Sequence, residues 1–120
     1  MKLRIKSKTE VFSHEVTSET VTIGRSSDND FVVPLEDFSR KHCLITFKGP
    51  YVYIMDLGSK NGVMVDGRRI KPNEQYPIYE TTRVVLANYF EFILPNGTSI
   101  KELDTPLPLT LEEIAERRRK

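Results

Sequence analysis

The sequence is poor in the residues that hold small proteins together through disulfides or metal ions. Its 120 residues include one cysteine, Cys43, and two histidines, His14 and His42. A single cysteine cannot form an intramolecular disulfide, and these side chains fall short of the four ligands of a structural zinc site. We therefore expect no metal and no cofactor, and a reducing, cytoplasmic environment.

The sequence also lacks an excess of one charge and any long apolar run. It has 18 basic and 17 acidic residues, for a formal net charge of +1, which predicts neither a broad nucleic-acid surface nor an acidic tail. The opening residues, MKLRIK, alternate apolar and charged side chains, unlike a signal peptide or a membrane span. We expect no membrane partner, and any anion-binding site has to be local.

What the sequence does contain is a series of short segments in which apolar and polar residues alternate. A chain of this length buries roughly two-thirds of its unfolded surface, which is enough for one core. Alternation with period two is typical of strands that send every second side chain into that core. We therefore predict an all-β sandwich or barrel, with strands at residues 3–6, 10–16, 20–23, 31–33, 43–47, 51–55, 63–65, 69–70, 75–78, 83–86 and 90–94.

Two of the intervening turns have sequences typical of tight hairpins. Lys48-Gly49-Pro50-Tyr51 connects two predicted strands through a pair of turn-forming residues. Val65-Asp66-Gly67-Arg68 carries a type I′ signal, because Asp and Gly both accept a positive φ. We predict that the strands on either side of Gly49-Pro50 pair with each other.

The composition changes after the last predicted strand. Prolines between residues 95 and 109 disfavour helix in the residues that precede them. Thr110-Leu111-Glu112-Glu113 resembles a capping box, and the basic residues at the end of the chain complement a helix dipole. We predict a folded domain at 1–95, a linker at 96–109 and a short helical tail at 110–120, and we favour a frayed tail over a tether to another domain.

Three turns combine glycine or Asx residues with a cation or a hydroxyl group. They are IGRSSDND at residues 23–30, SRKH at 39–42 and DLGSKNG at 56–62. Turns of this kind let backbone N–H groups and side chains converge on an anion. If a sandwich places all three at one end, they can form a single pocket from Arg25, Ser39, Arg40, Ser59, Lys60 and Asn61.

These motifs, in this order and spacing, resemble the forkhead-associated (FHA) domain. The matching residues are Gly24-Arg25, Ser39-Arg40-x-His42, Asp56–Gly62 and Val65-Asp66-Gly67, and the likeness extends over approximately residues 3–94. The resemblance implies an eleven-stranded β-sandwich whose loops at one end bind phosphothreonine in a partner protein. It also implies a preference for threonine over serine, through a small apolar pocket.

The resemblance further implies a set of phosphate ligands. Arg25 would make a charged hydrogen bond to the phosphate, and Ser39 and Arg40 would add a hydroxyl group and a second cation. Ser59 and Lys60 complete the expected set. Threonine or serine is common in the family where Lys60 stands, and a lysine supplies its charge as a mobile point donor or stays solvated.

Other positions concern the peptide and the support of the loops. The resemblance implies that Asn61 contacts the backbone of the bound peptide and that Gly24, His42 and Gly62 support the loops. Loops beside the phosphate select the partner sequence in the family. The carboxylate of Asp37 therefore predicts that acidic residues near the phosphothreonine are disfavoured.

Several of these residues also have plainer interpretations. Arg25 could form an ordinary surface ion pair with Asp28 or Asp30, which would contribute little energy. Ser39 could simply cap a turn, and Asn61 could hold one. Both roles for Asn61 are compatible.

The sequence gives little support for catalysis or nucleic-acid binding. Ser39 and His42 lack an identifiable third member of a catalytic triad, and Cys43 would point to the face opposite its neighbour His42. The Gly24 turn has no Walker lysine, and residues 28–30 lack the later positions of a calcium loop. There is no basic stripe with stacking aromatics, so a nucleic-acid partner is not expected.

We therefore predict a non-catalytic, phosphothreonine-dependent protein-binding module that acts in signalling. The alternative is an FHA-like domain that docks or self-assembles without phosphate. A further hypothesis is capture of the chain's own phosphorylated segments, either the tail through Thr105 or the N-terminal part through Thr17 or Thr20.

Overall fold

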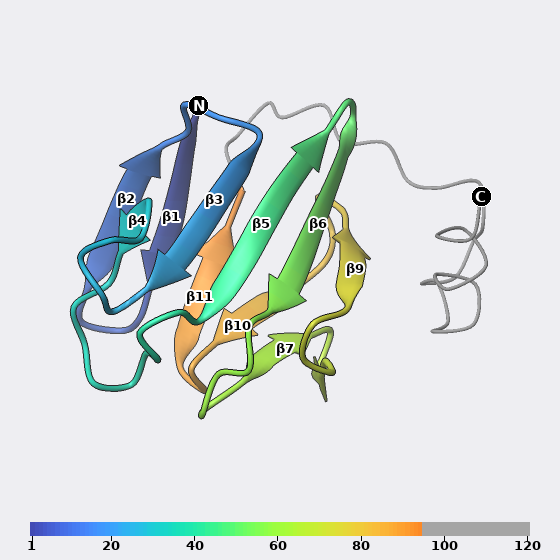
Figure 1. Ribbon diagram of the computed structural model, residues 1–120. Helices are drawn as coiled ribbons and strands as arrows, with labels where there is room; N and C mark the ends of the chain where they lie inside the picture. Colours follow the sequence, from blue (N-terminus) through green and yellow to red (C-terminus); the bar gives the residue numbers. More distant parts are fainter. Residues whose placement is uncertain (95–120) are drawn as a thin grey trace.

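Two β-sheets pack face to face in the computed structural model, which describes residues 1–94 (Figure 1). The first sheet has six strands in the order β2-β1-β11-β10-β7-β8, and the second has five in the order β4-β3-β5-β6-β9. The predicted all-β sandwich with eleven strands is confirmed. The strands are β1 (Lys2–Lys6), β2 (Val11–Glu15), β3 (Thr20–Gly24), β4 (Phe31–Val32), β5 (Cys43–Lys48), β6 (Tyr51–Asp56), β7 (Val63–Val65), β8 (Arg68–Arg69), β9 (Gln75–Ile78), β10 (Val84–Leu86) and β11 (Phe90–Ile93).

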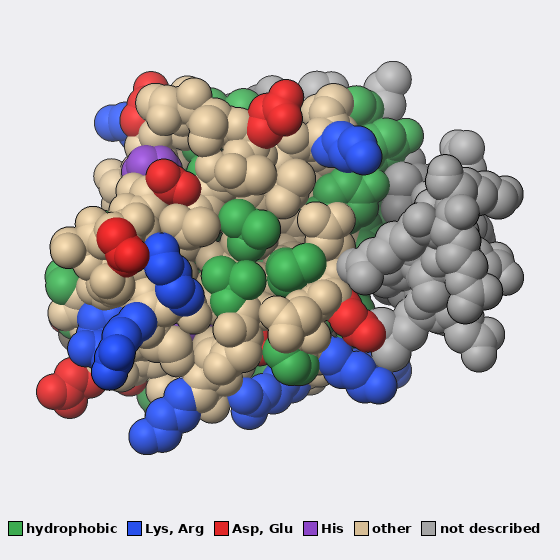
Figure 2. Space-filling model, in the orientation of Figure 1, with side chains coloured by type: hydrophobic (Ala, Val, Ile, Leu, Met, Phe, Trp, Pro, Cys, Tyr) green, Lys and Arg blue, Asp and Glu red, His purple; other side chains and the backbone are tan. Residues whose placement is uncertain are grey.

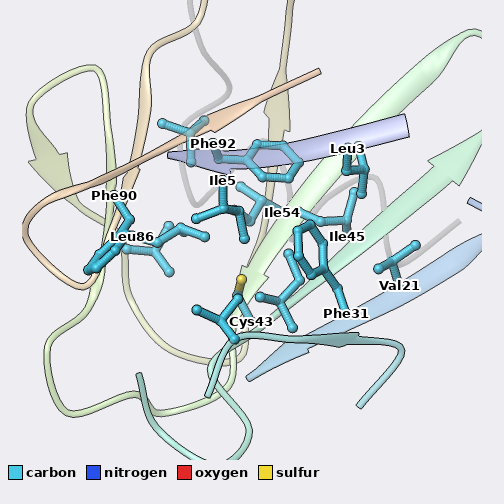
Figure 3. Close-up of a cluster of buried hydrophobic side chains, with 14 of the residues drawn as sticks. Leu3, Ile5, Val21, Phe31, Cys43, Ile45, Ile54, Leu86, Phe90 and Phe92 are labelled. Carbon is cyan, nitrogen blue, oxygen red and sulfur yellow. The ribbon is translucent and has the colours of Figure 1, made fainter. Parts of the chain in front are cut away.

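The core lies between the two sheets and follows the alternation in the sequence. In β1, Leu3 and Ile5 are fully buried while the residues on either side of them are exposed. Figure 3 shows these two side chains meeting Ile45 and Ile54 from the second sheet. Complete burial of a Leu or Ile side chain contributes about 1.5–3 kcal/mol, so this shared layer dominates the stability of the sandwich.

Both predicted hairpins are present. Lys48 pairs with Tyr51 across Gly49-Pro50, and Gly49 has a φ of +59°. Asp66 and Gly67 have φ values of +49° and +83°, as a type I′ turn requires at both central positions. The preference of Asp and Gly for positive φ therefore sets these turns locally.

Most of the predicted strands differ from the observed ones by one residue at an end, and one predicted segment lies outside the described residues. The strand predicted at 69–70 is β8 at Arg68–Arg69, because Ile70 turns into the core, where it is 5% exposed. Its N–H still donates to Val63 O over 3.0 Å. The predicted linker and helical tail, residues 96–120, lie outside the described residues. Within residues 1–94, no helix has the length and apolar character needed to cross a membrane.

The register of the second sheet brings three loops to one end of the sandwich. Ile23 near the end of β3 pairs with Cys43 at the start of β5, and Cys43 pairs with Asp56 at the end of β6. The chain therefore leaves β3, enters β5 and leaves β6 at the same end of the sandwich, the lower end in Figure 1. These are the loops that contain the three predicted anion-binding turns.

Candidate functional site

Backbone and side-chain hydrogen bonds join the three loops around Ser39. The N–H of Arg25 donates to Ser39 O over 3.0 Å, and the N–H of Ser26 donates to Arg40 O over 3.3 Å. The N–H of Lys60 donates to Ser39 Oγ over 2.9 Å. Ser39 thus contacts the loop after β3 through its carbonyl and the loop after β6 through its hydroxyl, so the structure brings Arg25, Ser39 and Lys60 together.

Gly24 allows the first two loops to approach this closely. A Cβ atom at this position would clash with the backbone carbonyl of Arg40 and would lie 2.8 Å from Asn29 Nδ2. Asn29 is buried, and its Nδ2 donates to Ser26 O over 2.8 Å and to Arg40 O over 2.7 Å. The sequence-based interpretation missed this role of Asn29, because the only local signal was an Asx residue in a turn.

The Arg25 side chain is exposed and is not used in an ion pair with its neighbouring aspartates. Its Nε donates to Phe38 O over 3.2 Å, which leaves the other guanidinium donors without a protein partner in residues 1–94. Asp28 pairs with Lys41 at 3.4 Å, and Asp30 accepts hydrogen bonds from β3. The plainer interpretation of Arg25 as a surface ion pair does not describe this arrangement.

The end of the sandwich that the three site loops form, which we call the rim, carries three cations with no acidic partner among residues 1–94. Arg25, Arg40 and Lys60 are all exposed, and the two ion pairs formed within residues 1–94 involve other residues. Figure 2 shows Lys and Arg side chains along the lower edge of the molecule, where these loops meet. A phosphate ester carries a charge of about −1.5 to −2 at neutral pH, so such a rim offers it several charged donors at once.

The hydroxyl group of Ser39 keeps its own proton free for an anion. A serine hydroxyl has one donor hydrogen and two acceptor lone pairs. Because Ser39 Oγ accepts the Lys60 amide, its position is fixed while the O–H hydrogen can still be donated. The half-buried Ser39 side chain therefore presents a donor at the junction of the loops.

The buried side chain of His42 links two of the site loops through its ring nitrogens. It is fully buried, its Nδ1 accepts the N–H of Ser39 over 3.2 Å, and its Nε2 lies 2.9 Å from Gly62 O. Since Nδ1 is an acceptor, the proton of the neutral ring sits on Nε2 and is donated to Gly62 O. Burial desolvates the ring and lowers the pKa of His42, and the hydrogen bond to Gly62 opposes part of this shift. The net lowering of the pKa favours the neutral form.

The loop after β6 uses Ser59 to hold its turn, and a phosphate contact by Ser59 remains a prediction. Ser59 is 5% exposed, its N–H donates to Asp56 Oδ1, and its Oγ accepts the N–H of Gly62 over 3.0 Å. Its side chain therefore lies inside the turn and holds it, rather than standing on the rim with the cations. Gly62 has a φ of +84°, so glycine is required at the point where this turn closes.

The side chain of Asn61 contacts the loop before β5. Its Nδ2 donates to Asp37 O over 2.8 Å, and the side chain is half-buried. Its amide oxygen has no hydrogen-bond partner among residues 1–94, so it remains an acceptor for a backbone N–H of a ligand. Asn61 therefore both holds a loop and offers a contact.

The arrangement of reactive side chains is unlike that of a nucleophile and its base. Both ring nitrogens of His42 are bonded to backbone groups, and the Ser39 hydroxyl is bonded to an amide. Burial raises the pKa of the Cys43 thiol, which keeps it protonated. In the described part of the chain, no three His, Cys, Asp or Glu residues come together in a group that could hold a metal ion.

Comparisons with known proteins agree with this fold and loop arrangement. The family model for the FHA domain matches residues 21–87, which include all three site loops. The FHA domain-containing protein FhaB of Mycobacterium tuberculosis is 29% identical over 69 residues, a match that covers 58% of this chain and 44% of FhaB. The aligned region thus spans less than half of the length of this curated relative.

Solved structures show the same architecture. The FHA domain of CT664 from Chlamydia trachomatis has a TM-score of 0.64 and 28% identity, covering 78% of this chain and 96% of that one. An FHA domain solved in work on phosphothreonine-dependent FHA interactions has a TM-score of 0.60 and 21% identity, covering 78% of this chain and 94% of that one. The chain belongs to the FHA domain family.

Proposed function

We propose that this domain binds phosphothreonine in a partner protein through the three loops joined at Ser39, and that it does so without catalysis. The observation that carries the proposal is the rim itself. Arg25, Arg40 and Lys60 lie there without acidic partners in the described part of the chain, beside a hydroxyl donor whose oxygen is already fixed. The phosphothreonine-dependent interactions of a solved FHA relative support the same assignment.

Each residue then has a distinct task. Arg25 supplies guanidinium donors to the phosphate, Arg40 and Lys60 add charge, and Ser39 donates its hydroxyl hydrogen. Asn61 accepts a backbone N–H of the peptide through its amide oxygen. Hydrogen bonds to charged groups contribute about 1.5–3 kcal/mol each, so a few such contacts account for a micromolar interaction worth about 8 kcal/mol.

The proposed partners are phosphorylated proteins met in the reducing cytoplasm, where the buried thiol of Cys43 stays unpaired. Capture of the chain's own phosphorylated Thr17 or Thr20 is restricted by geometry. Thr20 opens β3 and the site follows its other end, about 13 Å away at 3.3 Å per residue, so in the folded domain we expect this segment to reach the site of a second copy rather than its own. Thr105 lies outside the described residues, and its capture remains a hypothesis.

The test is a titration with a degenerate library of phosphothreonine peptides, its phosphoserine counterpart and its unphosphorylated counterpart. The phosphothreonine pool should bind, and the other two should bind at least about tenfold more weakly. Arg25→Ala should reduce binding about 100-fold, because a guanidinium contact of about 3 kcal/mol is lost. Lys48→Ala, a matched loss of an exposed cation at the opposite end, should leave it unchanged.

Two outcomes would contradict the proposal. Equal binding of phosphorylated and unphosphorylated peptides, retained by Arg25→Ala, would favour docking without phosphate. Binding of an oligonucleotide with a steep salt dependence, and no binding of any phosphopeptide, would favour a nucleic-acid partner.

A further inference from the structure

Arg69 packs against the site from outside the three site loops. Its Nη2 donates to Ser59 O and to Lys60 O, each over 3.2 Å. A Cβ atom on Gly62 would lie 2.6 Å from Arg69 Nε, so the guanidinium lies directly on the turn that carries Asn61. No sequence motif marks Arg69, because its place follows from the pairing of β8 with β7.

Arg69 is one of three exposed cations on or beside this loop that have no acidic partner within residues 1–94. Lys60 belongs to the loop that Arg69 contacts, and Lys71 precedes Pro72, which forms a bridge with Asp56 at the base of that loop. We call Lys60, Arg69 and Lys71 the basic ledge. Within residues 1–94, no carboxylate lies within 4.0 Å of any of their charged groups.

The nearest acidic side chains along the chain have other contacts. Asp66 Oδ1 accepts the N–H of Arg83, and Glu74 Oε2 accepts the hydroxyl of Tyr76. Asp56 is buried and accepts the N–H of Ser59. The Nε and Nη1 donors of Arg69 therefore have no partner among the described residues, and the charge of the ledge is not neutralised locally.

Acidic side chains lie on the part of the loop before β5 that Asn61 contacts. Glu36 is exposed and Asp37 is half-buried in the loop before β5, and the carbonyl of Asp37 is held by Asn61. Asn61 therefore lies between the acidic segment that its side chain contacts and the basic ledge, whose Arg69 contacts the carbonyl groups of Ser59 and Lys60. The two directions along a peptide bound at Asn61 are electrostatically different.

We propose that the basic ledge binds a second anionic group of the same phosphothreonine segment, on the side of the phosphothreonine away from Asp37. This inference rests on the proposed function and specifies its ligand. A carboxylate and a second phosphate both fit a guanidinium with free donors. An extended peptide advances about 3.3 Å per residue, so the second group lies within about four residues of the phosphothreonine.

The test uses phosphothreonine peptides in a neutral background, with Asp or its neutral counterpart Asn placed in turn at each of the four positions on either side. A second set carries a phosphothreonine in place of Asp. On one side only, one or two positions should favour the acid about tenfold over Asn. A gain from phosphate but not from Asp would identify a second phosphorylation as the source.

The variants separate this preference from general loss of binding. Arg69→Gln and Lys71→Gln should reduce the ratio of acidic to neutral affinity to about twofold or less. Arg69→Gln also removes hydrogen bonds to the turn that carries Asn61. Lys71 makes no hydrogen bond to the site loops, so Lys71→Gln tests the effect of charge alone. Arg68→Gln is the matched control, because strand alternation places Arg68 on the other face of β8, and it should keep the preference.

The outcomes distinguish this inference from the proposed function. Two results would contradict the proposed role of the basic ledge and leave the proposed function standing. One is binding of phosphothreonine peptides with no acid preference on either side, and the other is a preference that survives both Arg69→Gln and Lys71→Gln. Absence of binding to every phosphothreonine peptide would overturn the proposed function and the ledge with it.

Discussion

The two ends of the sandwich contain similar residue types but connect them differently. At the end opposite the site, Ser18 Oγ donates to Thr20 O and Thr82 Oγ1 accepts the N–H of Tyr79, contacts between residues two and three apart. At the site end, the bonds of Ser39 Oγ and Asn61 Nδ2 span 21 and 24 residues. The first two contacts each stabilise a single turn, whereas the second two fix the positions of separate loops.

This difference is a reason to assign the proposed anion binding to one end. A donor on an isolated turn, such as Lys48 beside Gly49-Pro50, can move freely and loses conformational entropy when it binds. Donors on loops that are already joined lose less on binding, because their positions are fixed before the ligand arrives. The predictions below test this contrast with matched changes at the two ends.

The largest effect is expected for glycine. Gly24→Ala places a methyl group against the carbonyl of Arg40, whereas a Cβ on Gly49 meets nothing within 4 Å. Gly24→Ala should lower the free energy of unfolding by about 2–4 kcal/mol and abolish phosphopeptide binding. Gly49→Ala should cost only about 1–2 kcal/mol, from its positive φ, and leave affinity unchanged in denaturation and titration experiments. Equal losses of affinity in Gly24→Ala and Gly49→Ala would contradict the proposed difference between the two ends.

The next effect concerns the two serines. Ser39→Ala removes both the acceptor of the Lys60 amide and the hydroxyl donor, and should weaken phosphopeptide binding about 10- to 100-fold. Ser18→Ala removes only a bond to Thr20 O and should leave binding unchanged. Isothermal titration of both variants, with thermal melts to confirm folding, measures the contrast. A loss of affinity in Ser18→Ala would show that the ends are not independent.

A smaller effect should appear as pH falls. Burial lowers the pKa of His42 in the folded state, so the unfolded chain binds a proton more readily. The stability that comes from neutral His42 is fully present above about pH 6.5, the unfolded value, and is lost as pH falls through the folded pKa. Protonation of Nδ1 also removes the acceptor of the Ser39 N–H, so phosphopeptide affinity should fall with it.

Urea denaturation between pH 5 and 8 measures this dependence. His42→Asn should lose the component assigned to His42, and His14→Asn should keep it, because His14 stacks on Phe31 and makes no hydrogen bond to the site loops. A pH profile of stability that is unchanged in His42→Asn and flattened in His14→Asn would show that His14 causes the pH dependence, and would contradict this prediction.

The smallest effect is expected for a single exposed lysine. Lys60→Gln removes one unpaired charge from the rim while its backbone N–H still bonds Ser39. Affinity for the phosphopeptide pool should fall about two- to fivefold at low salt and less at high salt, because exposed charges are screened. Lys48→Gln should change nothing at either salt concentration. A salt-independent loss would show that Lys60 acts through loop structure instead.

The sequence predicts the strands better than it predicts the contacts between loops. Alternation around Leu3 and Ile5 is a local property, as is the positive φ that Asp66 and Gly67 accept, so both could be predicted correctly. The motif match also identified Arg25 and Asn61 as rim residues. It also predicted Ser59 as a phosphate ligand, but it did not show that the Ser59 hydroxyl accepts the N–H of Gly62 within its own turn.

Two site residues had no adequate signal in the sequence. Asn29 bonds Arg40 O across 11 residues, and Arg69 bonds Ser59 O across 10. Such contacts depend on how strands pair and where loops end, which is decided by the whole sheet rather than by neighbouring residues. Ile70 likewise leaves its predicted strand because the core accepts its side chain.

The most direct test of the central claim is to map a phosphothreonine ligand onto the two ends by amide chemical-shift perturbation. On addition of the phosphothreonine peptide pool, the amides of Arg25, Ser39, Lys60 and Asn61 should shift together and saturably, while those of Ser18, Lys48 and Gly49 should not. The unphosphorylated pool should shift neither group. Shifts centred on the Gly49-Pro50 end, or spread evenly over both ends, would contradict the assignment of phosphothreonine to the loops joined at Ser39.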